Sequence, residues 1–324
     1  MRRLLLATTI TLLTAVAPSA LAITTFLADP NDPLYLANDA FYSGVARLTI
    51  NKPGIGSVSC TGSLLSGGLT LLTAAHCVTQ AGSLISGTTV DADFGGFGTF
   101  SSGNISVFPT YNSATNFGDL ALVFLGGPVT GAQTYNLYRT SDEAGQIGDI
   151  VGFGRFGSGA TGSVNAGNGV RRHGSNLVDY VASTSGMPAS GAAATFLAFD
   201  FDNGTADQNA LGLVDPVLYS NLGVGNSEVG AARGDSGGPT FLSNQIAGVT
   251  SFGACFGDGN GNCGMPPDVN STVDSSFGEL FFNTRVSSYA DWIDQEMAEI
   301  PEPNTLLLLG AGLAIIAGTR GKRY

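Results

Sequence analysis

Short apolar runs separated by turn-forming residues recur along most of this chain. Glycine alone provides 47 of the 324 residues, and many glycines stand between such runs. Short runs bounded by glycine, serine, asparagine and aspartate are typical of strands in β-sandwiches and β-barrels. The sequence therefore predicts an all-β protein rather than a helical bundle. The expected strands include residues 45–50, 68–72, 119–125, 150–153, 194–199 and 246–252.

One short helix is expected near the end of this β-rich region. Apolar residues recur at helical spacing between Tyr289 and Met297. Ser287 or Ser288 could cap the first turn of this helix. No low-complexity linker divides residues 40–295, which favours one unit.

The N-terminal residues have the pattern of a secretory signal peptide. Arg2 and Arg3 precede an apolar run, and Ala20-Leu21-Ala22 has the small-residue spacing of a cleavage site. We expect signal peptidase to cut after Ala22, so that the mature chain begins at Ile23. The alternative is a membrane anchor that is never cut.

The C-terminal residues form a second targeting signal. Pro301-Glu302-Pro303 is followed by an apolar run at 305–319 and then by Arg320, Lys322 and Arg323. This order resembles a PEP-CTERM sorting signal, which implies a Gram-negative bacterium, a short transmembrane segment, transient inner-membrane anchoring and processing by an exosortase. The alternative is a permanent anchor. The expected organisation is a signal peptide at 1–22, an N-terminal irregular segment at 23–40, a body at 41–298 and a sorting signal at 299–324.

Charge and cysteine content agree with export. The net charge of −12 would repel a phosphate backbone, so we expect no nucleic-acid partner. Four cysteines in an oxidising compartment allow three pairings. We expect Cys60–Cys77 and Cys255–Cys263, because each closes a short loop; free buried thiols are the alternative.

The segment Gly234-Asp235-Ser236-Gly237-Gly238-Pro239 carries the strongest chemical signal. Its glycines let the backbone turn sharply and approach a substrate. The N–H groups of Gly234 and Ser236 could then converge on a developing oxyanion. A serine hydroxyl needs a base to accept its proton, and histidine has the suitable pKa.

Two histidines compete for the role of base. His76 follows an apolar strand in Leu71-Leu72-Thr73-Ala74-Ala75-His76-Cys77, whereas His173 lies in a polar, loop-like setting and is expected at the surface. A third group must orient the imidazole. Asp119 opens the run 119–125 and fits this role; Asp91 and Asp93 are rivals in an apparent loop.

Together these residues resemble the trypsin/chymotrypsin family of serine peptidases, over about residues 40–295. The order His76, Asp119, Ser236 is that family's order, and Gly152-Phe153-Gly154 and Thr250-Ser251-Phe252-Gly253 also match. The resemblance implies two packed six-stranded antiparallel β-barrels with the site between them. It also implies a serine endopeptidase that acts on protein or peptide substrates through an acyl-enzyme.

The resemblance also assigns substrate-binding residues. Ser251, Phe252 and Gly253 would pair with extended substrate, and Gly230 would form the floor of the specificity pocket. Because Gly230 carries no charge, we expect cleavage after apolar residues, unless Glu228 swings into the pocket. In this family the aspartate before the serine pairs with a new N-terminal amine, which here makes Asp235 the partner of the Ile23 amine or of an internal group.

No cofactor or metal is required by this chemistry. Asp200-Phe201-Asp202-Asn203-Gly204, with Asp207, and Asp258-Gly259-Asn260-Gly261-Asn262 offer clustered oxygen ligands that could hold a structural calcium. A solvated acidic turn is the alternative for both. Ala232 replaces the cysteine that many family members bridge to the loop after Gly253, so that bridge is absent.

Overall fold

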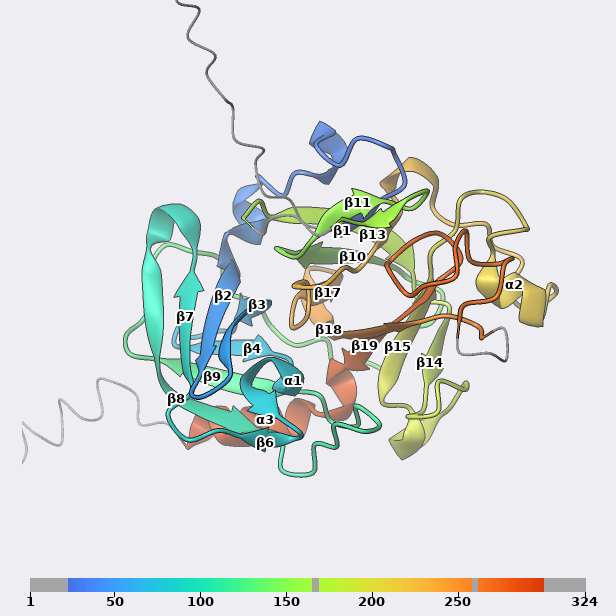
Figure 1. The fold of residues 1–324 in the computed structure, drawn as a ribbon. Coiled ribbons are helices and arrows are strands. Elements are labelled where there is room, and N and C mark those ends of the chain that lie inside the picture. The colour runs from blue at the N-terminus through green and yellow to red at the C-terminus, as the bar shows by residue number, and fades with distance from the viewer. Residues whose placement is uncertain (1–22, 165–168, 258–261, 300–324) are drawn as a thin grey trace, which may run out of the picture.

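The computed structural model describes residues 23–164, 169–257 and 262–299. Within them a six-stranded barrel and a seven-stranded sheet stand side by side (Figure 1). The barrel has the order β2-β3-β4-β9-β8-β7 and is closed. Its strands are β2 (Val45–Lys52), β3 (Gly56–Leu64), β4 (Thr70–Thr73), β7 (Thr89–Asp93), β8 (Thr99–Val107) and β9 (Ala121–Leu125).

The second sheet curls beside this barrel in the order β13-β10-β17-β18-β19-β15-β14. No strand pairing closes it among the described residues, but the side chain of Asn176 on β13 donates to the carbonyl of Asp200 on β15. The all-β, two-barrel prediction is confirmed, with a curled seven-stranded sheet as the second half. Its strands are β10 (Ile147–Gly152), β13 (Arg172–Leu177), β14 (Tyr180–Ala182), β15 (Phe196–Asp200), β17 (Pro239–Leu242), β18 (Gln245–Ala254) and β19 (Leu280–Arg285).

The remaining strands of the described residues form two smaller sheets. The first joins the start of the described chain to its middle, because β1 pairs with both β11 and β16. This corrects the expectation of an irregular segment at 23–40: Ile23, Thr24 and Thr25 are strand residues with no exposed surface. The strands are β1 (Ile23–Thr25), β11 (Phe156–Ser158), β12 (Gly162–Ser163) and β16 (Val229–Gly230), with β5 (Thr79–Gln80) and β6 (Ser83–Leu84) as a separate pair.

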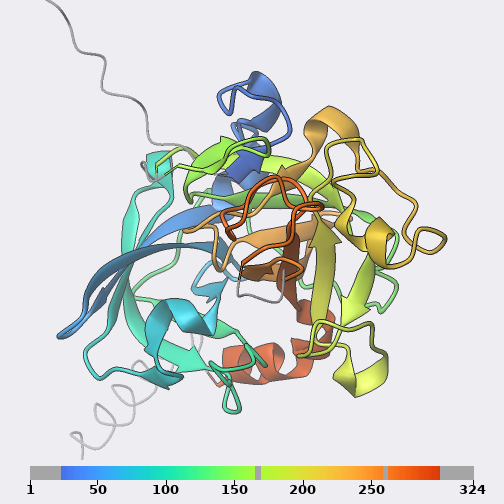
Figure 2. The same ribbon diagram turned by 45° about the vertical axis from the view of Figure 1, so that its right-hand side comes forward.

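In the part of the chain that the structure describes, helices are few and short. They are α1 (Ala75–Val78), α2 (Ala210–Val214) and α3 (Ala290–Ala298). Figures 1 and 2 show α3 beneath the barrel and α2 projecting from the far side of the second sheet. The described residues also contain six short 3₁₀ segments, at Pro33–Tyr35, Ala40–Gly44, Gly95–Phe97, Gly191–Ala193, Gly225–Ser227 and Val286–Ser288.

The predicted C-terminal helix is present, but its start is different from that expected. Tyr289 is the residue before the first helical residue, and it makes no side-chain cap. The hydroxyls of Ser287 and Ser288 instead donate to Glu143 and to the carbonyl of Ala194. These bonds attach the end of β19 to neighbouring segments, and they explain why neither serine serves as a cap.

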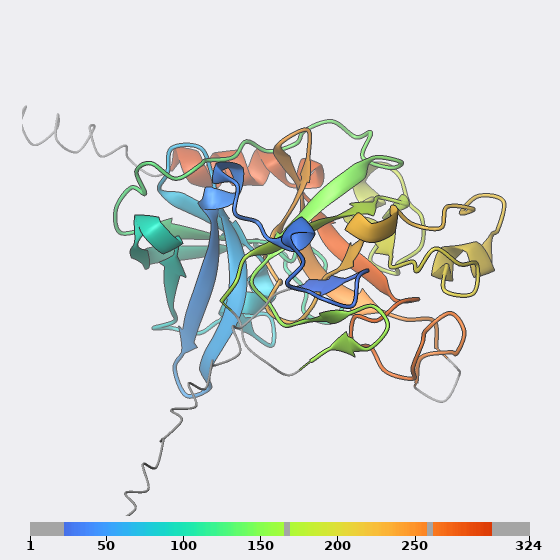
Figure 3. The ribbon, with the colours of Figure 1, turned by 90° about the horizontal axis from the view of Figure 1, so that it is seen from above.

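Apolar side chains form one core inside the barrel and another behind the second sheet. The barrel core extends to α3 through Tyr289 and Ile293, both nearly fully buried. It also includes Val151 and Phe241 of the second sheet, so that the two halves share apolar contacts. Viewed from above, the barrel and the second sheet lie next to each other, with a seam between them (Figure 3). This seam holds the segments that carry His76, Asp119 and Ser236.

Candidate active site

His76 lies in α1, directly after β4 enters the seam. A disulfide between Cys60 on β3 and Cys77 ties this short helix to the barrel wall. The buried ammonium of Lys52 donates to the carbonyls of His76 (3.2 Å) and Thr79 (2.7 Å), at the C-terminal end of the helix. Three strands therefore hold this helix of only four residues: β4 leads into it, β3 carries Cys60 and β2 carries Lys52.

Asp119 orients the imidazole of His76. Its Oδ2 lies 2.7 Å from Nδ1 of His76, and its Oδ1 accepts the backbone N–H of the same residue at 2.8 Å. The carboxylate is fully buried, whereas the imidazole side chain is 32% exposed. Burial by itself raises the pKa of Asp119, but the attraction of His76 and the hydrogen bonds from His76 and Ser251 outweigh burial and hold that pKa below its usual value.

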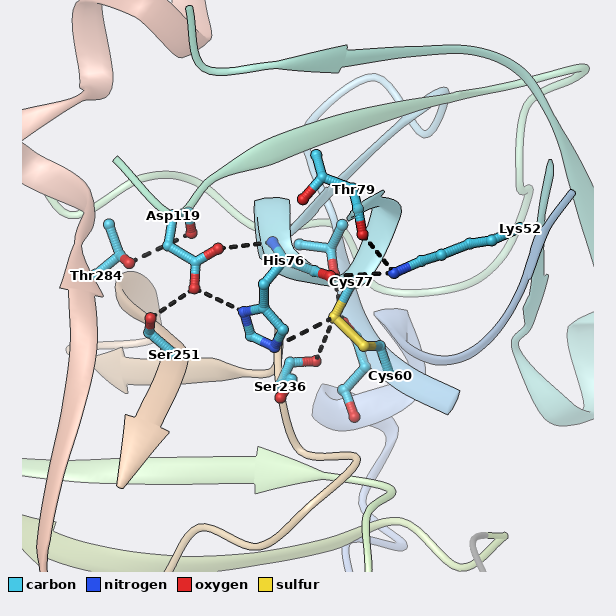
Figure 4. Close-up of polar contacts among 11 residues, drawn as sticks. Lys52, Cys60, His76, Cys77, Thr79, Asp119, Ser236, Ser251 and Thr284 are labelled. Carbon is cyan, nitrogen blue, oxygen red and sulfur yellow. Dashed lines mark hydrogen bonds and ion pairs between the residues drawn. A yellow bond between two sulfur atoms is a disulfide. The ribbon is translucent and has the colours of Figure 1, made fainter. Parts of the chain in front are cut away.

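Ser251 completes the surroundings of this carboxylate. Its hydroxyl donates to Oδ2 of Asp119 at 2.5 Å. The hydroxyl of Thr284 donates to the backbone carbonyl of Asp119 at 3.3 Å. Both partners belong to the second sheet, so the acid of the first barrel is held from both sides of the seam (Figure 4).

Ser236 stands at the turn between β16 and β17, beside the imidazole of His76 (Figure 4). No hydrogen bond joins the two side chains in this structure, although both are described. Catalytic hydrogen bonds are commonly long in structures without substrate and tighten when substrate binds. The sequence-predicted His76, Asp119 and Ser236 are therefore brought together, whereas Asp91 and Asp93 lie on strand β7 rather than in a loop, and neither contacts His76.

The backbone around Ser236 leaves two N–H groups free. The N–H groups of Asp235, Gly237 and Gly238 donate to carbonyls within or beside the turn. Among the described residues, the N–H groups of Gly234 and Ser236 have no acceptor. Gly234 has a φ of 100°, a conformation that favours glycine. These are the two donors that the sequence analysis selected for an oxyanion.

Thr61 positions this turn, a role that sequence reasoning missed. Its N–H donates to the carbonyl of Ser236 at 2.8 Å, and its hydroxyl donates to the carbonyl of Gly234 at 3.0 Å. The same hydroxyl accepts the N–H of Phe153 at 3.1 Å. Gly237, with a φ of 83°, packs so closely on Thr61 and Thr73 that a Cβ would collide with both. No local sequence signal marks a threonine that bridges three distant segments.

Asp235 is fully buried behind Ser236. Its carboxylate accepts the N–H groups of Gly154 and Ala232, each at 2.7 Å, and the N–H of Ile23 lies nearby. Burial raises the pKa of Asp235 to about 7, although these N–H groups and the nearby Arg172 act to lower it. Ile23, the first described residue, thus lies beside Asp235, which precedes Ser236.

A cavity of about 470 Å³ opens next to Ser236. Phe281 lines it, whereas Gly230, the expected floor, does not. A Cβ on Gly230 would contact the ring of Phe281, which shows that this ring lies against Gly230. The other lining residues are Arg155, Ser163, Ala231, Ala232, Arg233, Ser236, Thr250, Ser251, Phe252, Gly253, Val273, Asp274 and Ser275.

Glu228 does not reach this cavity. It is fully buried, and its carboxylate accepts the N–H groups of Asp202 (2.8 Å) and Val224 (2.6 Å). Burial raises the pKa of Glu228 to about 8, despite these two hydrogen bonds. The sequence-based alternative, in which Glu228 swings into the pocket, is therefore wrong for this structure.

The strand segment expected to bind substrate has one open edge. The pairing of β18 with β17 ends at Val249, whereas its pairing with β19 continues to Ala254. Phe252 and Gly253 therefore have a strand neighbour on one side only, next to the cavity. An extended peptide can add to such an edge through main-chain hydrogen bonds.

His173 forms a second His–Asp pair away from this site. It lies on β13, not in the expected loop, and its side chain is 25% exposed. Its Nδ1 lies 2.8 Å from Oδ1 of Asp149 and 2.9 Å from the hydroxyl of Tyr42. No serine hydroxyl bonds to this pair among the described residues, so it offers a matched comparison for His76.

The acidic segments considered for calcium have different outcomes. Asp200 and Asp202 are 3% and 1% exposed, so the solvated-turn alternative is wrong for them. Asp258-Gly259-Asn260-Gly261 lies outside the described residues. The structure has the expected Cys255–Cys263 disulfide and no free cysteine among its described residues.

Comparisons with known proteins agree with this geometry. Residues 40–185 match the family model described as Trypsin, and residues 299–323 match the PEP-CTERM protein-sorting motif. The chain contains a trypsin domain and is a serine-type peptidase. The collagenase of a structure titled "HL collagenase structure at 1.7 Å resolution" is similar in fold, with 21% sequence identity and a TM-score of 0.56. That similarity covers 82% of this peptidase and 98% of the collagenase. No curated protein matches.

The sorting motif shows that the peptidase is exported and sorted to the cell surface of a Gram-negative bacterium. The apolar run expected to form a transmembrane segment lies in residues 300–324, outside the described part. Within the described part, no helix has the length and apolar character needed to cross a membrane.

Proposed function

We propose that this peptidase hydrolyses peptide bonds through an acyl-enzyme formed on Ser236. The observation that carries the proposal is the pairing of His76 Nδ1 with the buried Asp119 at 2.7 Å, with Ser236 beside the same ring. This pairing keeps the proton on Nδ1, so that Nε2 is free to accept the proton of the serine hydroxyl.

In the first half of the reaction, Oγ of Ser236 attacks the substrate carbonyl carbon while Nε2 of His76 takes the hydroxyl proton. The N–H groups of Gly234 and Ser236, which have no acceptor among the described residues, stabilise the resulting oxyanion. The protonated His76 then gives its proton to the leaving amine, and the C–N bond breaks.

In the second half, water attacks the ester of Ser236. His76 takes a proton from this water and returns it to Oγ of Ser236 as the carboxylic acid product leaves. Asp119 stays ionised throughout, which agrees with its lowered pKa and with the hydroxyl donated by Ser251. No metal or cofactor takes part in these steps.

Substrate binding would use the open edge of β18 and the cavity beside Ser236. A peptide strand would pair with residues 252–253 and place the side chain before the scissile bond against Phe281, Ala231 and Ala232. These three walls favour an apolar side chain, because contact with them removes its apolar surface from water.

Export and processing would prepare the enzyme in two steps. Signal peptidase would remove residues 1–22, and an exosortase-type enzyme would release the body from the inner membrane by cutting at or after Pro301-Glu302-Pro303. The intact mass of the mature protein should then lack residues 304–324. Recovery of the complete C-terminus from membranes would favour a permanent anchor.

Matched kinetics test the proposed roles. Ser236→Ala and His76→Ala should each remove nearly all activity, and the double variant should be little worse, because the residues act as one unit. His173→Ala is the control, since it also breaks a His–Asp pair. If His173→Ala abolished activity while His76→Ala did not, the assignment would be wrong.

A further inference from the structure

The loop before β19 carries oxygen-bearing side chains at regular spacing. Relative to its first residue, these side chains stand at positions 1, 3, 5, 7, 9 and 12 of a twelve-residue stretch. The same positions supply the ligands of EF-hand calcium loops, in which position 7 uses its backbone carbonyl and position 12 is a glutamate. Two positions differ from that pattern: position 5 is a threonine, and position 6 is Val273 instead of glycine. The residues are Asp268, Asn270, Thr272, Asp274, Ser276 and Glu279.

Two carboxylates of this loop are buried with an unpaired oxygen each. Asp268 is 2% exposed and Glu279 is fully buried. Oδ2 of Asp268 and Oε2 of Glu279 have no hydrogen-bond partner. A buried polar atom without a partner is costly, and it calls for a ligand or an ion. This observation is independent of the sequence spacing.

The other oxygens of the two carboxylates meet at one hydroxyl. Oγ of Ser276 lies 3.1 Å from Oδ1 of Asp268 and 3.3 Å from Oε1 of Glu279. Backbone N–H groups donate to the same oxygens: that of Asn270 to Oδ1 of Asp268 at 2.9 Å, and those of Asp274 and Ser276 to Oε1 of Glu279 at 2.7 Å and 3.0 Å. No Lys, Arg or His of the described chain forms an ion pair with either acid. Negative charge therefore accumulates here without a protein cation.

A third carboxylate and an amide oxygen lie on the same loop. Nδ2 of Asn270 lies 3.3 Å from both carboxylate oxygens of Asp274, and its Oδ1 accepts the N–H and hydroxyl of Thr272. Gly162, with a φ of 69°, packs against the Asp274 carboxylate so closely that a Cβ would collide with it. Hard oxygen ligands of this number, on a loop rather than a rigid frame, suit Ca²⁺ better than the smaller Mg²⁺.

We propose that the loop 268–279 binds one Ca²⁺ ion, with Asp268 and Glu279 as the buried ligands. Asn270 and Asp274 would turn oxygens toward the ion when it binds, because without it the amide nitrogen of Asn270 faces the carboxylate of Asp274. The ion would supply the positive charge that the two buried carboxylates lack. It would also give their unpaired oxygens a partner.

The same loop forms one wall of the cavity beside Ser236. Val273, Asp274 and Ser275 line that cavity. The hydroxyl of Ser275 donates to the carbonyl of Ala231 at 2.7 Å, and the carbonyl of Asp274 accepts the N–H of Ser163 at 2.7 Å. Calcium would therefore fix the pocket wall against the segment that leads to Ser236. This consequence, unlike the binding itself, rests on the proposed function.

Calcium binding is tested on the mature chain with Ser236→Ala, which prevents self-digestion. After treatment with EDTA, titration calorimetry with CaCl₂ should show one site, and thermal unfolding should shift upward with Ca²⁺ and little with Mg²⁺. Asp268→Asn and Glu279→Gln should each weaken binding by at least about tenfold, because calcium affinity follows the number of charged ligands.

Asp202→Asn is the matched control, because Asp202 is equally buried but lies outside the loop 268–279. It should leave calcium binding unchanged. Absence of binding, or binding that survives both loop substitutions, would overturn the proposal. Binding that is lost only in Asp202→Asn would do the same. Should either loop variant fail to fold, Asn270→Ala tests the same ligand set from a half-buried position.

The consequence for catalysis is measured separately on the active enzyme. Calcium should lower KM for peptide substrates more than it changes kcat, and Asn270→Ala should reduce this response. Binding without any effect on KM would contradict the coupling to the pocket but not the site. Binding together with an unreactive Ser236 would contradict the proposed function and leave the calcium site standing.

Discussion

The backbone N–H of Ile23 lies near the buried carboxylate of Asp235, which immediately precedes Ser236, and acts to lower the pKa of that carboxyl. Ile23 also begins β1, which pairs with β11 and β16. Removing residues 23–25 would therefore remove a strand from the sheet. Cleavage after Ala22 would instead place a charged amine at this position, beside the carboxylate.

We expect the active, exported enzyme to begin at Ile23. A free amine there would pair with Asp235 and hold the turn that carries Ser236, so signal removal itself would complete the active site. N-terminal sequencing of the purified active enzyme checks this expectation. A start within residues 30–45 would instead indicate a separate activating cleavage.

The pH dependence of stability should reveal the buried carboxylate. In a form extended by one residue before Ile23, Asp235 has only N–H partners, and its pKa of about 7 exceeds the ordinary value of 3.8. The folded state then holds the proton more tightly than the unfolded state. The free energy of unfolding should therefore fall as pH rises from about 4 to about 7, by on the order of 4 kcal/mol, and then level off.

Asp235→Asn provides the control for this pH series. In the extended form it should abolish the fall, so that the variant is more stable than its parent at pH 8. In the form that starts at Ile23 it should be destabilising, because it removes the partner of the new amine. Denaturant unfolding at pH 5 and pH 8 measures both effects. Equal pH profiles for the extended parent and its Asn variant would contradict the account.

Thr61 should control catalysis without touching substrate. Thr61→Val keeps the shape but removes the hydroxyl that joins Gly234 to Phe153. The carbonyl of Gly234 and the N–H of Phe153 would lose their partner, which typically costs about 1–3 kcal/mol for a buried group. We expect a lower kcat with little change in KM, and rescue by Thr61→Ser. A variant with unchanged kcat would show that the turn is held by other contacts.

Specificity should follow Phe281 rather than Gly230. Because the ring of Phe281 lies against Gly230 and lines the cavity, we expect cleavage after medium or large apolar residues. Phe281→Ala should enlarge the cavity and shift preference toward larger side chains. A peptide-library cleavage profile measures both forms. Dominant cleavage after Arg or Lys would contradict this prediction and would make Asp274 the anion of the pocket.

The sequence was sufficient for features that rest on local pattern. The strands near 45–50, 150–153 and 246–252 are confirmed, because apolar runs between turn residues encode them directly. The helix at α3 is also confirmed, although its start is set by tertiary hydrogen bonds of Ser287 and Ser288.

Features that depend on contacts between distant segments were missed. Residues 23–25 look irregular alone and become a strand only because β11 and β16 flank them. Nothing local marks Thr61 as the bridge to the serine turn, or Phe281 as a wall of the cavity. The loop 268–279 did carry a readable spacing, but the burial of its carboxylates is visible only in the folded chain.

The most direct test of the account is covalent labelling of the serine. The mature enzyme should react with a fluorophosphonate, and peptide mapping by mass spectrometry should place the single adduct on Ser236. Labelling should be absent in Ser236→Ala, much slower in His76→Ala and unchanged in His173→Ala. An adduct on another residue, or equal labelling of His76→Ala and the parent enzyme, would contradict the proposed roles of Ser236 and His76.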